Sequence, residues 1–381
     1  MPAPAPALAV PELWDSIIDC LSSSQDHSST ALVCRSFVSR AQQNLFRVVV
    51  IEQRSLPGMY FYSSPNPGIS STVVATRLAT LLDGSPHLLS YIQTLEIADS
   101  HPECYAILAQ IPWSHLETLI LRFLSFLQDE CFEHIKVLAR INSLRELHFS
   151  RDAEPYALRQ ILPVSQHLTS LRLTYQEWTG ARDSGMPALS TSQRPRIERL
   201  SLDACTAVTG FLCQVFDFGG LRSLELIDSL TPDMSHFLSR FGSTVESITL
   251  SSRERDRYED TDHWDLGLYF PRLTTIKFLS LPTVSFIRFI AGLPLDNCIS
   301  YIRFTVHAMT LVEKEISATD AIAFEAVALA QLSVLKGVEV ELRTSRYIWP
   351  GGVIEISVRE LFPRLWERQL VTICELDGVE D

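Results

Sequence analysis

The sequence predicts an α/β protein in which a small N-terminal helical domain precedes an irregular right-handed solenoid, a horseshoe of strand–helix repeats. Three observations lead to this fold class. A short apolar strand pattern recurs along most of the chain, helical patterns separate its copies, and residues 10–50 carry apolar residues at helical spacing. With 381 residues, of which 46% are hydrophobic, the chain is long enough for a small domain and a larger one.

The recurring unit reads apolar-x-x-apolar-x-apolar, which is typical of a strand that buries alternate residues. Ten copies begin 24, 28, 24, 29, 24, 24, 28, 26 and 36 residues apart, and most of these intervals are typical of leucine-rich repeats. The apolar positions of the copies are Ile92/Leu95/Ile97, Leu116/Leu119/Leu121, Leu144/Leu147/Phe149, Leu168/Leu171/Leu173, Ile197/Leu200/Leu202, Leu221/Leu224/Leu226, Val245/Ile248/Leu250, Leu273/Ile276/Phe278, Ile299/Ile302/Phe304 and Leu335/Val338/Val340. We therefore predict parallel strands that line one side of the repeats, with helices on the other.

Helical patterns occupy the intervals between these strands. Apolar residues at helical spacing are centred on residues 132–138, 211–216 and 286–290, and a further helix is predicted from Pro232 to Phe241, with Gly242 as its C-cap. Residues 318–332 predict another helix, followed by a last strand near 335–342 and a divergent C-terminal cap. Two polar inserts, 180–196 and 251–265, are interpreted as solvated loops, with contact to a partner as the alternative.

The N-terminal segment predicts two helices with more apolar surface than about 40 residues can bury alone. Pro11 suits a first helical position, and an apolar stripe follows it through Ile17 and Leu21. The polar run 22–29 is expected to end this helix and to supply the N-cap of the next. In the second helix Val33 and Phe37 share one face, so that either the repeats or another protein must cover it.

This segment resembles an F-box in the order of its residues: Val10-Pro11-Glu12-Leu13, Ile17-Ile18, Leu21, Val33-Cys34-Arg35 with Phe37, and Leu45-Phe46-Arg47. Val10 stands where the family has Leu, and Phe37 where it has Trp. The resemblance implies docking on a Skp-type adaptor and, through it, on a cullin scaffold. The residues it implies for that contact are Val10, Pro11, Leu13, Ile17, Leu21, Val33, Cys34, Phe37 and Leu45. Residues 48–50, 70–82 and 86–92 extend the resemblance to F-box proteins of mushroom-forming fungi.

The predicted domains are therefore a disordered N-terminus at 1–9, the F-box helical domain at 10–50, a linker and capping helix at 51–90, and the leucine-rich-repeat-like domain at 91–381. The alternative for residues 10–50 is a helical cap on the repeats, without a docking role.

The strand positions that alternate with the apolar ones are expected to form the concave, partner-facing side of the repeats. Their mixture of charged, imidazole and aromatic side chains suits protein recognition, although a sheet also needs a solvated face. These candidate target-binding residues are Glu146, His148, Arg172, Arg199, Asp203, Glu225, Lys277, Tyr301, Arg303, Glu339 and Glu341.

Composition narrows the class of partner. The formal net charge is −13, without a run of Lys or Arg, which disfavours nucleic acid or an anionic membrane as the partner. The eight cysteines include no Cys-x-x-Cys pair, and no apolar run reaches the length of a membrane span. We therefore expect an intracellular protein, cytoplasmic or nuclear.

No nucleotide-binding, zinc-protease or serine-hydrolase motif is present in the sequence. Cys131, His134 and Glu130 lie one helical turn apart, but no second ligand pair complements them. We therefore expect no catalysis, cofactor or metal. The resemblance and the repeats together imply a substrate-recognition subunit of an SCF-type ubiquitin ligase, which binds an unidentified protein target. The alternative is a repeat scaffold that has no link to ubiquitin.

Overall fold

The structure is a computed structural model, and it describes residues 11–21, 23–52, 70–99, 101–122, 129–150, 155–174, 194–205, 208–227, 232–251, 269–279, 284–294, 296–307, 318–343 and 357–376. The chain divides into two compact units, Met1–Leu168 and Thr169–Asp381. The expected disordered segment at 1–9 and most of the two polar inserts lie outside the described residues.

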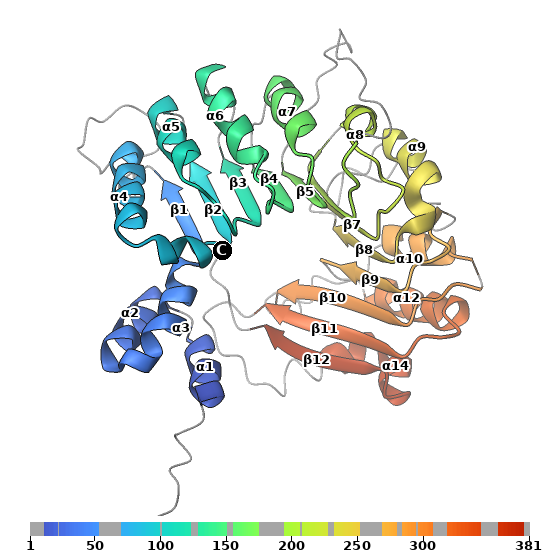
Figure 1. The fold of residues 1–381 in the computed structure, drawn as a ribbon. Coiled ribbons are helices and arrows are strands. Elements are labelled where there is room, and N and C mark those ends of the chain that lie inside the picture. Colours follow the sequence, from blue (N-terminus) through green and yellow to red (C-terminus); the bar gives the residue numbers. More distant parts are fainter. Residues whose placement is uncertain are drawn as a thin grey trace, which may run out of the picture. The chain divides into compact units, whose positions relative to one another are not determined.

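The first unit opens with three helices and continues with strand–helix repeats (Figure 1). Its elements are α1 (Pro11–Asp19), α2 (Ser24–Val33), α3 (Arg35–Phe46), β1 (Val48–Glu52), α4 (Ser71–Gly84), η2 (Pro86–Ser90), β2 (Thr94–Ala98), α5 (Pro102–Gln110), β3 (Thr118–Arg122), α6 (Asp129–Ala139), β4 (Glu146–Ser150), α7 (Pro155–Ile161) and η4 (Leu162–Val164).

The second unit continues the alternation of strands and helices. Its elements are β5 (Ser170–Thr174), β6 (Arg199–Asp203), α8 (Thr209–Val215), β7 (Ser223–Ile227), α9 (Pro232–Phe241), η6 (Gly242–Thr244), β8 (Ser247–Ser251), β9 (Thr275–Phe278), α10 (Val284–Ala291), β10 (Tyr301–His307), α12 (Ala318–Gln331), β11 (Gly337–Arg343), α14 (Pro363–Glu367) and β12 (Val371–Leu376).

Within each unit every strand pairs in parallel with the next strand in the sequence. Parallel neighbours need a crossover connection, and in Figure 1 the repeat helices of each unit lie along one face of its strands. A recurring hydrogen-bond pattern sets the register. The carbonyl of Glu117, which precedes β3, accepts the amides of Arg145 and Glu146 at 2.8 and 2.9 Å, and the carbonyl of Glu198 does the same for Arg222 and Ser223.

The core lies between the strands and the helices, and alternate strand residues fill it. Leu95 and Ile97 of β2 are fully buried, and the registers place equivalent residues of neighbouring strands beside them. In the second unit phenylalanines continue this core: the ring of Phe278 stacks on that of Phe286 at 4.2 Å, and Phe304 stacks on Phe362 at 5.8 Å. Burial of each such side chain contributes about 1.5–3 kcal/mol.

All ten predicted strands are confirmed, and the described residues form two further strands, β1 and β12, that the sequence pattern did not predict. β1 pairs with β2, with Val49 beside Leu95 and Ile51 beside Ile97. The repeats therefore begin at Val48, ahead of the expected boundary at residue 91. At the other end β12 pairs with β11, so a further strand follows the one predicted near 335–342.

The N-terminal segment forms three helices, where the sequence predicted two. The polar run expected to separate two helices is itself helical, because Ser23 caps α2: its Oγ accepts a hydrogen bond from the Asp26 amide at 3.0 Å. The expected second helix is interrupted at Cys34, whose backbone is extended (φ −152°, ψ 144°). Val33 and Phe37 consequently belong to different helices, α2 and α3.

Gly242 follows α9 but is not a left-handed C-cap. Its φ lies outside the left-handed region, and it begins the short helix η6. Glycine is required here for steric reasons, because a Cβ at this position would lie 2.7 Å from the Tyr269 carbonyl oxygen.

Candidate functional site

The helix α3 anchors the N-terminal segment to the first repeat. Ser39 Oγ lies 3.3 Å from the Tyr91 hydroxyl, and Arg47 Nε donates to Gln93 Oε1 at 3.1 Å. The Arg47 carbonyl accepts the amides of Gln93 and Thr94, both at 3.0 Å. The C-terminal end of α3 is therefore part of the repeat register, whereas α1 and α2 pack mainly on α3.

The helix α1 is held on α3 by an aromatic contact and a polar cluster. The rings of Trp14 and Phe37 are 5.0 Å apart. Asp19 Oδ1 accepts hydrogen bonds from Arg40 Nε at 2.7 Å and from Asn44 Nδ2 at 3.0 Å. The hydrogen bonds from Arg40 and Asn44 lower the pKa of Asp19 to about 2. Asp19 is therefore ionised, and the cluster intact, at any pH near neutrality.

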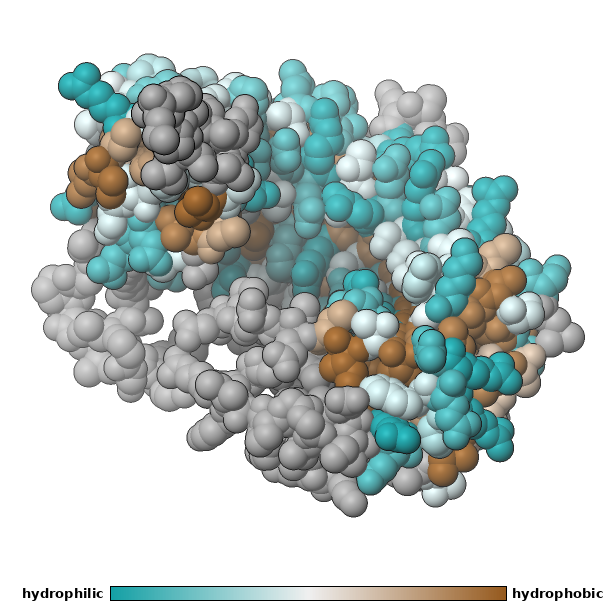
Figure 2. All heavy atoms as spheres, turned by 90° about the horizontal axis from the view of Figure 1, so that it is seen from below, coloured by the Kyte–Doolittle hydropathy of each residue, from teal (hydrophilic) through white to brown (hydrophobic). Residues whose placement is uncertain are grey.

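The N-terminal helices expose several apolar side chains. Ile17 on α1 is 53% exposed, and Val33 at the end of α2 is 73% exposed. Leu32, which the sequence analysis did not single out, is 88% exposed. Figure 2 shows hydrophobic residues at the surface of this segment. The repeats of the first unit thus leave apolar residues on both α1 and α2 uncovered.

The other residues implied by the F-box resemblance are distributed as follows. Cys34 is exposed, and Leu21, Phe37 and Leu45 are half-buried. Pro11 begins α1, while Val10 and the side chains of Pro11 and Leu13 lie outside the part of the chain that the structure describes.

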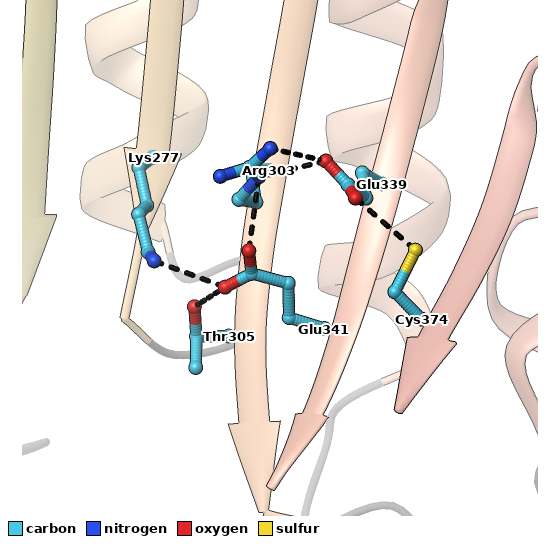
Figure 3. Close-up of polar contacts among 6 residues, drawn as sticks. All are labelled: Lys277, Arg303, Thr305, Glu339, Glu341 and Cys374. Atoms are coloured by element: carbon cyan, nitrogen blue, oxygen red, sulfur yellow. Dashed lines mark hydrogen bonds and ion pairs between the residues drawn. The ribbon is translucent and has the colours of Figure 1, made fainter. Parts of the chain in front are cut away.

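A second candidate site lies on the helix-free face of β9–β12. The registers bring Lys277 beside Arg303 and Arg303 beside Glu339, and place Glu341 between Thr305 and Cys374. Figure 3 shows these six side chains meeting in one network. Four of them are sequence-predicted candidates. Thr305 and Cys374 were missed, although Thr305 follows Arg303 by two residues and therefore shares its face.

Glu341 is the buried centre of this network, with 6% of its surface exposed. Its Oε2 accepts hydrogen bonds from Lys277 Nζ at 2.9 Å and Thr305 Oγ1 at 2.7 Å, and its Oε1 lies 3.1 Å from Arg303 Nε. Burial opposes ionisation, but these hydrogen bonds and the charges of Lys277 and Arg303 outweigh it and lower the Glu341 pKa below its ordinary value of 4.5.

Glu339 extends the network to the last strand. Its Oε2 accepts from Arg303 Nε at 2.7 Å and pairs with Nη2 at 2.6 Å, while its Oε1 accepts from the Cys374 thiol at 3.1 Å. The hydrogen bond to Glu339, together with burial and the nearby negative charges, raises the pKa of Cys374. The raised pKa favours the protonated thiol, which donates this hydrogen bond.

Tyr301 stands at the edge of the network and is 53% exposed. The register places it between Thr275 and Gly337. Its Cδ1 and Cε1 atoms lie 3.5 Å from the position that a Cβ on Gly337 would occupy, so a side chain at position 337 would pack directly on the ring, and glycine keeps that flank free of one.

The remaining candidates lie apart from this network. In the second unit Arg172 pairs in register with Ser201, whose hydroxyl donates to Glu225 at 2.5 Å. Arg199 is exposed, whereas Asp203, at the end of the same strand, is only 3% exposed. Glu146 and His148 lie on β4 of the first unit and are half-buried.

Neither a metal centre nor a membrane span emerges from the described ranges. They contain no group of three or more His, Cys, Asp or Glu side chains placed to hold a metal ion. Of the pair considered above, Cys131 is buried in the core. No helix within these ranges has both the length and the apolar character needed to cross a membrane.

The parallel strands, one for each leucine-rich repeat, with a polar helix-free face, define the class as an α/β repeat fold of the leucine-rich type. No family model matches the sequence, and no curated protein matches it. Among solved structures the chain is similar to the leucine-rich repeat-containing protein LegL7 from Legionella pneumophila. The two are 16% identical over 83% of this chain and 98% of that chain, with a TM-score of 0.43. The strand registers, and not this likeness, define the chain as a leucine-rich type of α/β repeat fold.

Proposed function

We propose that the chain is the substrate-recognition subunit of an SCF-type ubiquitin ligase. The N-terminal helices dock on a Skp-type adaptor, which connects to a cullin scaffold, and the repeats bind a protein target. The chain itself is not an enzyme, because the catalytic groups belong to other subunits. Its contribution to the rate comes from holding the target at high effective concentration near a conjugating enzyme.

The observation that carries this proposal is the exposure of Ile17, Leu32 and Val33. Ile17, Leu32 and Val33 are 53%, 88% and 73% exposed, and Leu32 and Val33 are the two most exposed large apolar side chains of the described residues. Exposed apolar residues gathered on one segment mark a site of interaction. The same segment holds the sequence order that resembles an F-box. The anchoring of α3 fits this role, because it holds the docking helices at a defined place on the first repeat.

The double substitution Ile17→Asp with Val33→Asp tests the docking role. Two carboxylates at exposed sites leave the fold intact but cannot be buried against an apolar partner without a large desolvation cost. We expect capture of a purified Skp-type adaptor to fall at least about tenfold in a pull-down, as for the loss of interface hot spots.

Ile322→Asp on α12 is the matched control, because Ile322 is 51% exposed and lies in the other unit. It should capture the adaptor as the wild-type chain does, and circular dichroism should show all three chains folded. Equal capture by the double variant would contradict the proposal.

A second candidate function is a repeat scaffold in which α1–α3 serve only as a cap. The contacts of α3 with Tyr91 and Gln93 favour it, since a cap covers the end of a repeat array. Failure of the folded wild-type chain to bind any Skp-type adaptor would support this scaffold role.

A further inference from the structure

The helix-free face of the second unit carries a row of small side chains that leads to Tyr301. Successive registers place Ser223 beside Ser247, Ser247 beside Thr275, Thr275 beside Tyr301, and Tyr301 beside Gly337. Between Ser223 and Gly337, Tyr301 is the one large residue, and more than half of its surface is exposed. On the other side of Ser223 the register places the exposed Arg199. With strands about 4.8 Å apart, an extended segment of about six residues would span β7 to β11.

The charged network lies beside this row, and its positive and negative side chains pair with one another. Lys277 and Arg303 face two carboxylates, Glu339 and Glu341, and both acids are hydrogen-bonded to these cations. An acidic ligand would have to break pairs that are already made, and a basic ligand would meet carboxylates that are already occupied. Within this network the charges cancel. Farther along the same face the exposed Arg199 and the half-buried Glu225 add one charge of each sign, so the surface offers no net charge to attract either kind of ligand.

The network nevertheless leaves N–H donors without a partner among the described residues. The Lys277 ammonium has three N–H donors and contacts Glu341, and the Arg303 guanidinium uses Nε and Nη2 but not Nη1. Both side chains are partly exposed. Donors whose charge is balanced suit neutral acceptors such as peptide carbonyls. Because the network locks these side chains in place, little entropy is lost when they bind.

We infer that this surface, formed by Ser223, Ser247, Thr275, Tyr301 and Gly337 with Lys277 and Arg303 alongside, binds an uncharged extended segment of the target protein. An aromatic or proline side chain of that segment packs on the Tyr301 ring in the space above Gly337, and its carbonyls accept hydrogen bonds from Lys277 and Arg303. This inference rests on the proposed function only in assuming that the repeats hold a protein target.

A displayed library of random ten-residue peptides, selected on the full-length chain, tests the inference. We expect the enriched peptides to have a net charge near zero and to contain an aromatic residue or proline. Their affinity, measured by fluorescence anisotropy, should change less than about twofold between 50 and 500 mM NaCl, because screening affects charge pairing and not neutral contacts.

Two variants and a control locate the binding surface. Tyr301→Ala removes the ring and Gly337→Val fills the space beside it, and each should weaken peptide binding at least about tenfold, as expected for a central anchor. Ile322→Ala, at an exposed site on α12, should change it less than about twofold. Gly337→Val is included because valine is favoured in strands, so a loss of binding in this variant cannot be attributed to a destabilised β11.

Three results would overturn the inference: enrichment of acidic peptides whose affinity falls steeply with salt, binding that is indifferent to Tyr301→Ala, or no enrichment at all. Adaptor capture is measured on the same chains. A chain that captures the adaptor but no peptide refutes this inference alone, and a chain that binds peptide but no adaptor refutes the docking proposal alone.

Discussion

Glu341 shows how one residue can hold several strands together. It lies on β11 and contacts Lys277 on β9 and both Arg303 and Thr305 on β10, so it links side chains up to 64 residues apart. A buried carboxylate is costly unless its oxygens are satisfied, and here two cations and a hydroxyl satisfy them. Removing it would leave Lys277 without its carboxylate partner, whereas Arg303 would keep only its pair with Glu339.

We predict that Glu341→Gln lowers the free energy of unfolding by about 1–3 kcal/mol at pH 7. Because the pKa of Glu341 is lowered in the folded chain, the contribution of the carboxylate is complete above 4.5, its ordinary pKa. It is lost as the pH falls through the lowered value. The deficit of the variant, measured by urea unfolding, should therefore shrink as the pH falls below 4.5.

Glu133→Gln provides the comparison at a surface ion pair. Glu133 pairs with Lys136 at 2.7 Å, but its side chain is 74% exposed, so its loss should leave the free energy of unfolding nearly unchanged. Equal effects of the two substitutions would mean that the burial of Glu341 contributes nothing.

At the scale of the elements, the ends of the helices depend on capping hydrogen bonds and local backbone conformation, which the spacing of apolar residues does not reveal. The polar segment before Ala31 forms α2 because Ser23 caps it, and the chain turns to an extended backbone at Cys34 before α3 begins. Strand β1 did carry the repeat pattern, as Phe46, Val49 and Ile51. It was missed because its interval to Ile92 is nearly double the usual spacing.

Gly242, between α9 and β8, offers a test at this scale. We predict that Gly242→Ala destabilises the chain by about 1–3 kcal/mol, because the new Cβ would press on the Tyr269 backbone. Gly210→Ala in α8 should instead stabilise by about 0.5–1 kcal/mol, since no atom lies within 4 Å of its Cβ position. If the thermal unfolding midpoints of the two variants shifted in the same direction, the steric explanation for Gly242 would be contradicted.

At the scale of the whole molecule, the stability of each unit is built from contacts between successive repeats, because its described strands pair with their neighbours in the sequence. In the second unit β7 is paired on both sides, whereas β12 has a described partner only in β11. Glu325, buried in α12, supports this end by accepting the Leu365 amide at 2.7 Å, in the helix that precedes β12.

We predict that β12 opens before the interior strands of its unit. Hydrogen–deuterium exchange should be faster for the amides of residues 371–376 than for those of residues 223–227, because opening β12 breaks one strand pairing and opening β7 breaks two. Glu325→Gln should accelerate exchange in β12 and leave β7 unchanged. Equal protection of the two strands would show that the unit unfolds as a single cooperative body.

Much of the fold was predictable from local pattern, because the residues that bury a repeat strand lie within six positions of one another. The ten strands, the helix at 318–331 and the role of Pro11 as a first helical residue are examples. β12 was not predictable in this way: Arg368 stands where the pattern requires an apolar residue, although Val371 and Ile373 follow in register.

The sequence by itself determined the repeat architecture, since hydrophobic spacing decides which face of each strand or helix is buried, and it also marked Lys277, Arg303, Glu339 and Glu341 on the helix-free face of the second unit. Only the tertiary structure decided which of those residues meet. Lys277, Arg303, Glu339 and Glu341 form one network because parallel registers align them, whereas Asp203 is buried and Arg199 exposed on the same strand. The exposure of Ile17, Leu32 and Val33 was likewise settled in three dimensions, because it depends on what distant parts of the chain leave uncovered.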